Sequence, residues 1–276
     1  MNDLQHYLQA VEPGKLFLGL SSHNRPETID LDNDTPHILF SVPSGGGKSI
    51  AVALLACQIL HQGGELVVID LDMATNWIKD GDHLIPGVTY ARTIEEAHSQ
   101  LVQLGELQKI RNATADADPD YAPHRLLIVV EEPNRTSEAL ISYWADMRQK
   151  GTSPALRALR GLSFGGRKRR MHLLVTAQKG EAAIFGTTGG GAARENFTYR
   201  VLGGTASEGT WDMLTDVTQR PEQTRHQGRM FIIEGINWRP VQVGYLTNQQ
   251  ARDWATNGIR PAEAEATEAE LPGWLQ

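Results

Sequence analysis

One glycine-rich segment constrains the fold of this chain more than any other part of its sequence. VPSGGGKS, from Val42 to Ser49, closes the β-like run 37–42 and directly precedes a helical pattern at 49–61. Glycines let backbone N–H groups close around phosphate oxygens, Lys48 supplies positive charge for the β- and γ-phosphates, and a Ser hydroxyl can bind Mg²⁺. A strand, such a loop and a helix in this order predict a nucleotide-binding P-loop, with ATP held by Ser44, Gly45, Gly46, Gly47, Lys48 and Ser49.

The loop departs from the usual pattern at its first position, where Val42 stands in place of a glycine. A β-branched residue resists positive φ angles, so we expect the chain to enter the loop in an extended conformation. The substitution keeps open an alternative in which the chain binds a nucleotide but hydrolyses it slowly.

A second motif ends in two acidic residues. LLIVVEE, from Leu126 to Glu132, has the composition of a buried strand followed by a pair of carboxylates. In nucleotide hydrolysis the first carboxylate of such a pair holds Mg²⁺, and the second accepts a proton from the attacking water. We therefore expect Ser49 and Glu131 to bind the metal and Glu132 to act as general base, although Glu131 stands where Asp is usual.

The rest of the chain alternates β-like and helical patterns without internal repeats. Helical patterns cover 49–61, 93–111, 137–149 and 248–256, and β-like runs cover 37–42, 65–69, 126–130, 172–176, 199–202, 230–233 and 241–245. Strands separated by helices predict an α/β fold, namely a RecA-like, doubly wound and mostly parallel sheet with helices on both faces. The stretches 112–123 and 180–195 are expected to be polar or glycine-rich loops.

Composition excludes several classes of protein. With 276 residues, 40% hydrophobic and 21% charged, the chain is long enough for one large α/β domain. No apolar run is long enough to span a bilayer, and the N-terminus lacks the features of a signal peptide, so we expect a cytoplasmic protein. The single cysteine, Cys57, lies in an apolar helical pattern, which excludes a disulfide or zinc framework.

Positive charge is concentrated in one segment. The net charge is −7, which by itself argues against a nucleic-acid partner, yet the segment 148–170 contains several basic residues and no acidic one. This pattern suits DNA phosphates, but it is equally typical of a solvated helix face with a loop. The candidates for DNA contacts in it are Arg148, Lys150, Arg157 and Arg160.

These motifs together resemble the FtsK/SpoIIIE and HerA group of DNA translocases. Beyond the P-loop and the acidic pair, the similarity includes LFLGL, LVVIDLDM, MHLLVTAQKG, ARENFTYRV and HQGRMFII with the RPVQVGYLTNQQARDWA that follows. The resemblance covers about residues 14–258 and implies a motor domain there, after an N-terminal extension at 1–13 and before an acidic flexible tail at 259–276. It also implies that Gln178 is a polar sensor near the γ-phosphate.

Arginine has a further role in the family, since one subunit presents it to the nucleotide of its neighbour. The position that matches is Arg167, with Arg200 as the second candidate. The resemblance therefore implies a homo-oligomeric ring, most often a hexamer, that binds Mg²⁺ and ATP and moves double-stranded DNA.

Three functions remain open at the level of sequence. The first is a DNA translocase for transfer or segregation, and the second is a viral genome-packaging ATPase, which would place the protein in a virion. The third is a nucleotide-binding ring adaptor with little hydrolysis, which the replacements at Val42 and Glu131 keep open. A protein-secretion motor is a further possibility in the same superfamily. The acidic tail carries Leu271, Trp274 and Leu275, which could dock a partner protein, although a tail without function is the simpler interpretation.

Overall fold

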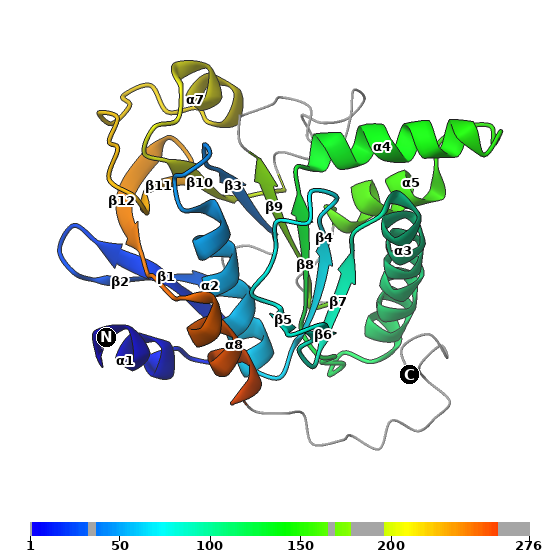
Figure 1. Ribbon diagram of the computed structural model, residues 1–276, viewed down its shortest axis with the longest axis horizontal. Helices are drawn as coiled ribbons and strands as arrows, with labels where there is room; N and C mark the ends of the chain where they lie inside the picture. The colour runs from blue at the N-terminus through cyan, green and yellow to red at the C-terminus, as the bar shows by residue number, and fades with distance from the viewer. Residues whose placement is uncertain (1, 33–36, 165–168, 178–195, 259–276) are drawn as a thin grey trace.

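A ten-stranded β-sheet forms the centre of the described structure (Figure 1). The computed structural model describes residues 2–32, 37–164, 169–177 and 196–258. The strands of the sheet lie in the order β2-β1-β12-β11-β10-β3-β9-β8-β4-β7, and a separate small ribbon pairs β5 with β6. The strands are β1 (Lys15–Ser21), β2 (Pro26–Asp30), β3 (His37–Ser41), β4 (Glu65–Ile69), β5 (Lys79–Asp80), β6 (His83–Leu84), β7 (Val88–Ala91), β8 (Leu126–Glu131), β9 (Met171–Ala177), β10 (Tyr199–Gly203), β11 (Arg229–Glu234) and β12 (Asn237–Val243).

The half of the sheet from β10 to β7 is parallel. Strands β3 and β8 are buried along almost their whole length, which explains why their sequences are continuous apolar runs without alternation. Parallel strands end at the same edge of a sheet, so the P-loop after β3 and the acidic pair at the end of β8 lie at one edge. Strand β9 lies between them, and its carboxyl end therefore separates the two motifs.

The other half of the sheet is antiparallel. Strand β11 pairs with β10 and β12, and β12 pairs with β1, which forms a hairpin with β2. The turn between β11 and β12 consists of Gly235 and Ile236, and Gly235 has a φ of 59°, as a two-residue hairpin turn often requires. The mostly parallel α/β sheet predicted from the sequence is confirmed.

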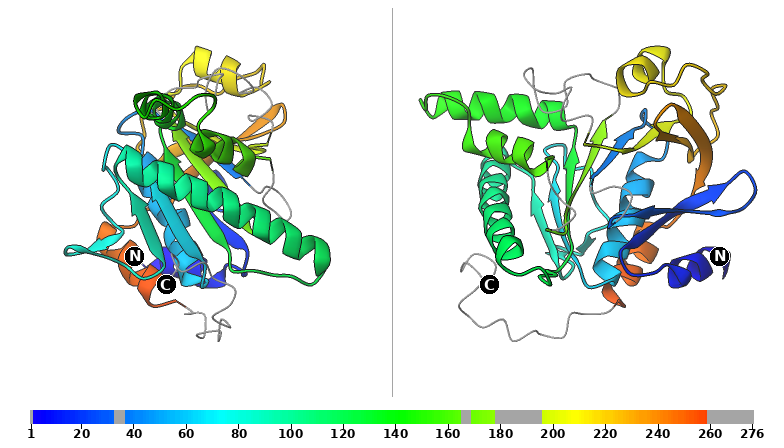
Figure 2. Two further views of the ribbon diagram at one scale, coloured as in Figure 1. Left: turned by 90° about the vertical axis from the view of Figure 1, so that its right-hand side faces the viewer. Right: turned by 180° about the vertical axis from the view of Figure 1, so that it is seen from behind.

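Helices cover both faces of the sheet. In Figure 1, α2 and α8 lie to the left of β8 and β4, whereas α3 lies to the right. One apolar core joins the sheet to α1, α2 and α8, and a second joins it to α3, α4 and α5; Figure 2 shows the same layers from two other directions. The helices are α1 (Asn2–Ala10), α2 (Lys48–His61), α3 (Ile94–Ala117), α4 (Pro133–Asp146), α5 (Pro154–Leu162), α7 (Glu208–Leu214) and α8 (Asn248–Thr256). None of the helices in the described ranges is both long and apolar enough to cross a membrane.

The boundaries of several helices differ from the sequence predictions. Helix α3 continues to Ala117, although 112–123 was predicted to be a loop. The alanines in this stretch favour helix, and the buried Arg111 anchors it by donating to the carbonyl of Arg169 at 2.8 Å. Helix α5 was not predicted because its arginines obscure an amphipathic pattern in which Leu156 and Leu159 are buried.

Candidate nucleotide-binding site

The P-loop joins β3 to α2 and contains two glycines with left-handed backbones. Gly45 has a φ of 79° and Gly47 a φ of 99°, angles that are unfavourable for a residue with a Cβ atom. Gly47 is the N-cap of α2. The free N–H groups of the first helical turn and the positive end of the helix dipole therefore face the loop. This arrangement binds phosphate in many proteins.

Close packing explains why other positions around the loop need to be small. A Cβ atom at Gly46 would lie 2.7 Å from Cγ1 of Val42, and one at Gly203 would lie 2.8 Å from Cδ of Pro43. Val42 is fully buried, and its N–H donates to the carbonyl of Ala177 at 3.0 Å, which extends the pairing of β3 with β9. The chain thus enters the loop in an extended conformation, as the β-branched side chain of Val42 requires.

Lys48 lies between the two carboxylates at the end of β8. Its Nζ is 3.1 Å from Oε2 of Glu131 and 3.0 Å from Oε1 of Glu132, and all three side chains are largely buried. Burial acts to lower the pKa of Lys48, but the two carboxylates outweigh it and raise the pKa above its usual value. Lys48 is therefore a cation at neutral pH, and the three side chains form one charged cluster beside the P-loop.

Thr176 of β9 belongs to the same cluster, although sequence reasoning did not select it. It pairs directly with Glu131 across the sheet, and its hydroxyl donates to Oε2 of that residue. Thr176 is fully buried. A buried hydroxyl needs a hydrogen-bond partner, so the only signal in the sequence was a threonine inside the apolar run MHLLVTA. Thr176 fixes the orientation of the Glu131 carboxylate.

Glu132 occupies an unfavourable backbone conformation. Its φ of 47° and ψ of 67° place it in the left-handed region, directly before Pro133 at the start of α4. Two backbone hydrogen bonds hold Glu132 in this conformation. Its N–H donates to the carbonyl of Thr176 at 2.9 Å, and its carbonyl accepts from the N–H of Thr136 at 3.0 Å. Non-glycine residues in this region often mark functional sites. Here the sharp turn aims the Glu132 side chain at Lys48.

A small cavity of about 140 Å³ adjoins the two residues predicted to bind the metal. Ser49 and Glu131 line it, together with Thr75 and Asn76 from the loop after β4. Asp70 accepts from both the N–H and the hydroxyl of Thr75, at 2.9 and 2.8 Å. Asp70 therefore orders this loop.

The donor set of this cavity fits Mg²⁺. Mg²⁺ prefers oxygen ligands and usually keeps several waters, with one or two carboxylates and the phosphates of a substrate. Ser49 and Glu131 supply oxygens of that kind. Within the described ranges, no group of three or more His, Cys, Asp or Glu side chains gathers into a preformed metal site, so a metal here would depend on the nucleotide for most of its ligands.

A second cavity, of about 110 Å³, also adjoins the P-loop, and Ile50 lines both cavities. Gly47 and Ile50 form one wall, and Gly228, Gln242 and Tyr245 form the other. The N–H of Gly228 donates to the carbonyl of Gly46 at 3.3 Å, which ties the P-loop to the segment before β11. Tyr245, which lines this cavity, is 66% exposed. One cavity thus lies beside Ser49 and Glu131, the predicted metal-binding residues, and the other lies beside Gly47.

The remaining predicted residues do not join this cluster. The guanidinium of Arg200 is hydrogen-bonded within its own chain, because Nε donates to the carbonyl of Phe197 at 2.8 Å and Nη1 to that of Leu214 at 2.7 Å. These contacts hold the end of α7 and favour a structural role for Arg200. Arg167 and Gln178 lie outside the described residues, and their roles remain predictions.

The predicted DNA contacts lie away from the P-loop. Arg148 and Lys150 are exposed on the turn after α4, and Arg157 and the partly buried Arg160 belong to α5. Helix α4 has 14 residues and starts at the acidic pair, so its far end is about 21 Å away at a rise of ~1.5 Å per residue. Figure 1 shows α4 projecting away from the sheet toward this turn.

Comparisons with solved structures identify the class of fold. The conjugation coupling protein TcpA of pCW3, solved with ATPγS, superposes with a TM-score of 0.63 at 16% identity, over 86% of this chain and 67% of TcpA. The cytoplasmic domain of EssC gives a TM-score of 0.66 at 18% identity, over 88% of this chain but only 46% of EssC. VirB4 of Thermoanaerobacter pseudethanolicus gives 0.53 at 11% identity, over 87% and 98%. No protein-family model and no curated protein matches the sequence.

The strand order, the P-loop and the acidic pair together define a P-loop ATPase fold. More particularly, the chain shares its fold with the conjugation coupling protein TcpA, the type VII secretion ATPase EccC and the cytoplasmic domain of EssC.

Proposed function

We propose that this chain is an ATPase that uses hydrolysis to move double-stranded DNA and that works as a homo-oligomeric ring. The observation that carries the proposal is the cluster in which Lys48 lies within 3.1 Å of both Glu131 and Glu132, directly after a P-loop with left-handed glycines. A scaffold with little hydrolysis needs no second carboxylate in a strained conformation, so the geometry favours an enzyme over an adaptor.

Each residue of the cluster has a distinct task in the proposed reaction. The N–H groups from Gly45 to Ser49 bind the phosphates, and Lys48 leaves the carboxylates to neutralise the β- and γ-phosphates. Ser49 and Glu131 would hold Mg²⁺, which stabilises the negative charge of the leaving group when bound. Glu132, released from its ion pair with Lys48, then accepts the proton of the attacking water.

The adenine base is proposed to enter the cavity beside Gly47. Ile50 follows Ser49, the residue proposed to bind the metal, and lines both this cavity and the one beside Glu131. An exposed tyrosine at the mouth of a cavity is well suited to stack on an aromatic base. Tyr245 therefore supports a nucleoside triphosphate over inorganic triphosphate as the substrate.

Ring assembly and DNA binding extend the proposal. Arg167 is proposed to complete the site of a neighbouring subunit, since the described guanidinium of Arg200 is already engaged inside its own subunit. DNA would contact the exposed turn after α4, where Arg148 and Lys150 lie. EccC has been solved with a signal sequence peptide, so movement of a polypeptide is the second candidate.

Phosphate release with and without DNA tests both parts of the proposal. The wild type should release phosphate from ATP, and Lys48→Ala should reduce the rate to background, because the charge on the phosphates is lost. If Lys48→Ala retains most of the rate, the assigned site is wrong. Double-stranded DNA should stimulate the wild type, whereas stimulation only by a polypeptide would favour the second candidate.

Two variants, each with three charge reversals, test the proposed DNA-binding surface. Changing Arg148, Lys150 and Arg157 to Glu should abolish stimulation by DNA but spare basal hydrolysis. It should also reduce the slope of log affinity against log salt concentration by up to about 3. The control changes three other basic surface residues, Arg25, Arg92 and Lys109, to Glu, which alters net charge equally. Equal effects of the two triple variants would contradict the assignment of this surface.

A further inference from the structure

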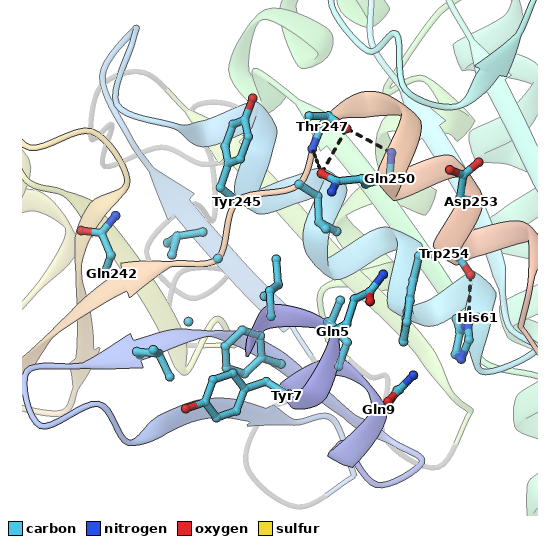
Figure 3. Close-up of a pocket in the computed structure, with 18 of the residues that line it drawn as sticks. Gln5, Tyr7, Gln9, His61, Gln242, Tyr245, Thr247, Gln250, Asp253 and Trp254 are labelled. Atoms are coloured by element: carbon cyan, nitrogen blue, oxygen red, sulfur yellow. Dashed lines mark hydrogen bonds between the residues drawn. The ribbon is translucent and has the colours of Figure 1, made fainter. Parts of the chain in front are cut away.

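A large groove lies on the face of the molecule formed by the two terminal helices (Figure 3). It has a volume of about 1120 Å³ and is bounded by α1, β1, the segment after β12 and α8. Figure 3 labels residues from α1 and from α8 around it, so segments from the two ends of the described chain form one site. Its lining does not include Lys48 or the acidic pair, but Gln242, Val243 and Tyr245 line both this groove and the cavity beside Gly47.

Aromatic and aliphatic side chains form much of the groove wall, next to polar ones such as Gln250 and Asp253. Tyr7 of α1 stacks on Phe17 of β1 with ring centroids 5.2 Å apart, and His61 stacks on Trp254 of α8 at 4.2 Å. His61 Nδ1 also lies 2.8 Å from the carbonyl of Trp254, which fixes this pair. Leu4 contributes a partly buried aliphatic side chain. Concave apolar surfaces of this size are typical of binding sites.

The described chain leaves α8 at the edge of this groove. Asn257 lines the groove, and Gly258 is so close to α2 that a Cβ atom on it would lie 2.2 Å from the carbonyl oxygen of His61. Residues 259–276 therefore start from the groove itself. The acidic part of that segment, up to Glu270, can span up to about 40 Å when extended, whereas α8 has nine residues and is about 14 Å long.

The segment after Glu270 is rich in apolar residues, as is much of the groove wall. The run Glu263 to Glu270 alternates glutamate with small residues, and the apolar residues Leu271, Trp274 and Leu275 come only at its end, around a Pro-Gly pair. A sequence of this kind joins a solvated spacer to a compact apolar group, and Pro-Gly allows the chain to turn so that these side chains meet one surface.

We propose that the segment Leu271–Leu275 docks in this groove of its own subunit. Attachment through a short spacer keeps the segment at a millimolar effective concentration near the groove, far above that of the same segment on another molecule in dilute solution. The apolar walls formed by Tyr7 and Trp254 receive its aliphatic and indole groups, and the glutamates stay in water. The inference does not depend on the proposed ATPase activity.

Disulfide trapping tests the docking in the full chain. The native Cys57 is fully buried, and burial raises the pKa of its thiol, so it does not compete. The test variant combines Gln5→Cys, on the exposed face of α1 at the groove, with Gln276→Cys. The control combines Ile141→Cys, which is 51% exposed on α4, with Gln276→Cys.

Under mild oxidation, the test variant should form an intramolecular disulfide at least about ten-fold faster than the control, because docking raises the local concentration of Gln276→Cys at α1. The bond is read as a faster monomer band on a non-reducing gel. Adding Trp274→Ser to the test variant should remove the advantage. Equal rates in test and control would overturn the proposal, and so would a test variant that gives mainly cross-linked dimers, since the segment would then bind another subunit.

Discussion

Replacing Glu132 by glycine and by glutamine separates its backbone strain from its charge. Glu132 has a φ of 47° and a ψ of 67°, a conformation that costs a residue with a Cβ atom about 1–2 kcal/mol. Glutamine retains the Cβ atom and the strain but loses the charge that faces Lys48. Glycine loses the same charge and also relieves the strain. The difference between the two variants therefore contains the backbone term, together with the loss of the side chain and the greater freedom of glycine in the unfolded chain, which a control position must correct for.

We expect Glu132→Gly to be more stable than Glu132→Gln by about 1 kcal/mol, while both variants fail to hydrolyse ATP. The free energy of unfolding is measured by urea titration followed by circular dichroism, without nucleotide. The midpoint should shift while the slope stays constant. This outcome would mean that the chain gives up stability in order to aim the carboxylate at the reaction site.

An exposed position on the same helix provides the matched control. Glu138 lies within α4, and in a helix interior glycine is less favourable than glutamine by several tenths of a kcal/mol. Glu138→Gly should therefore be less stable than Glu138→Gln, the opposite order to position 132. If glycine is the less stable variant at both positions, Glu132 carries no strain and the reasoning fails.

Three further predictions concern other residues. Thr176→Val should lower the free energy of unfolding by about 1 kcal/mol and slow hydrolysis, whereas Thr176→Ser should restore both; equal rates for the two would contradict the role of the hydroxyl. Burial lowers the pKa of His37 to about 4. Unfolding therefore takes up a proton between about pH 6.5 and 4, and this histidine should lower the free energy of unfolding of the wild type by about 3 kcal/mol over that range. His37→Asn keeps an acceptor for the N–H of Leu173, and its free energy of unfolding, measured by urea titration, should fall less over the same pH range. Parallel pH profiles of this free energy for the wild type and the variant would refute the prediction. Arg167→Ala should bind ATP but hydrolyse it poorly, and mixing it with Lys48→Ala subunits should restore activity; co-assembled rings that stay inactive would exclude Arg167 as the residue that acts on a neighbour.

The core of the fold was predictable because its signals are local. Continuous apolar runs such as those of β3 and β8 indicate strands that are buried on both faces, and the sheet has them in its parallel half. The glycines of the P-loop follow from the backbone angles that a phosphate-binding turn requires. The strand, loop and helix around Gly47 can therefore be predicted from one short stretch of sequence.

Helix boundaries were less predictable because tertiary contacts decide them. Polar and alanine-rich residues allowed either a loop or a helix after Arg111, and the contact of Arg111 with the carbonyl of Arg169 extends α3 to Ala117. Helix α7 is short, and its Trp211 is buried against Phe231 of the distant strand β11. The sequence of so short a helix cannot by itself show which distant strand its side chains contact.

The sequence by itself determined which chemical groups are available to the site, because the P-loop lysine and the acidic pair are recognisable from their neighbours in the chain. Only the tertiary structure decided how these groups meet. The register of β8 against β9 brings Thr176 to Glu131, and the turn into α4 aims Glu132 at Lys48. The packing of α7 engages Arg200, and the approach of α1 to α8 creates a groove from the two ends of the described chain. Each of these contacts joins residues far apart in the sequence, and their pairing depends on strand order and helix packing, which no local pattern encodes.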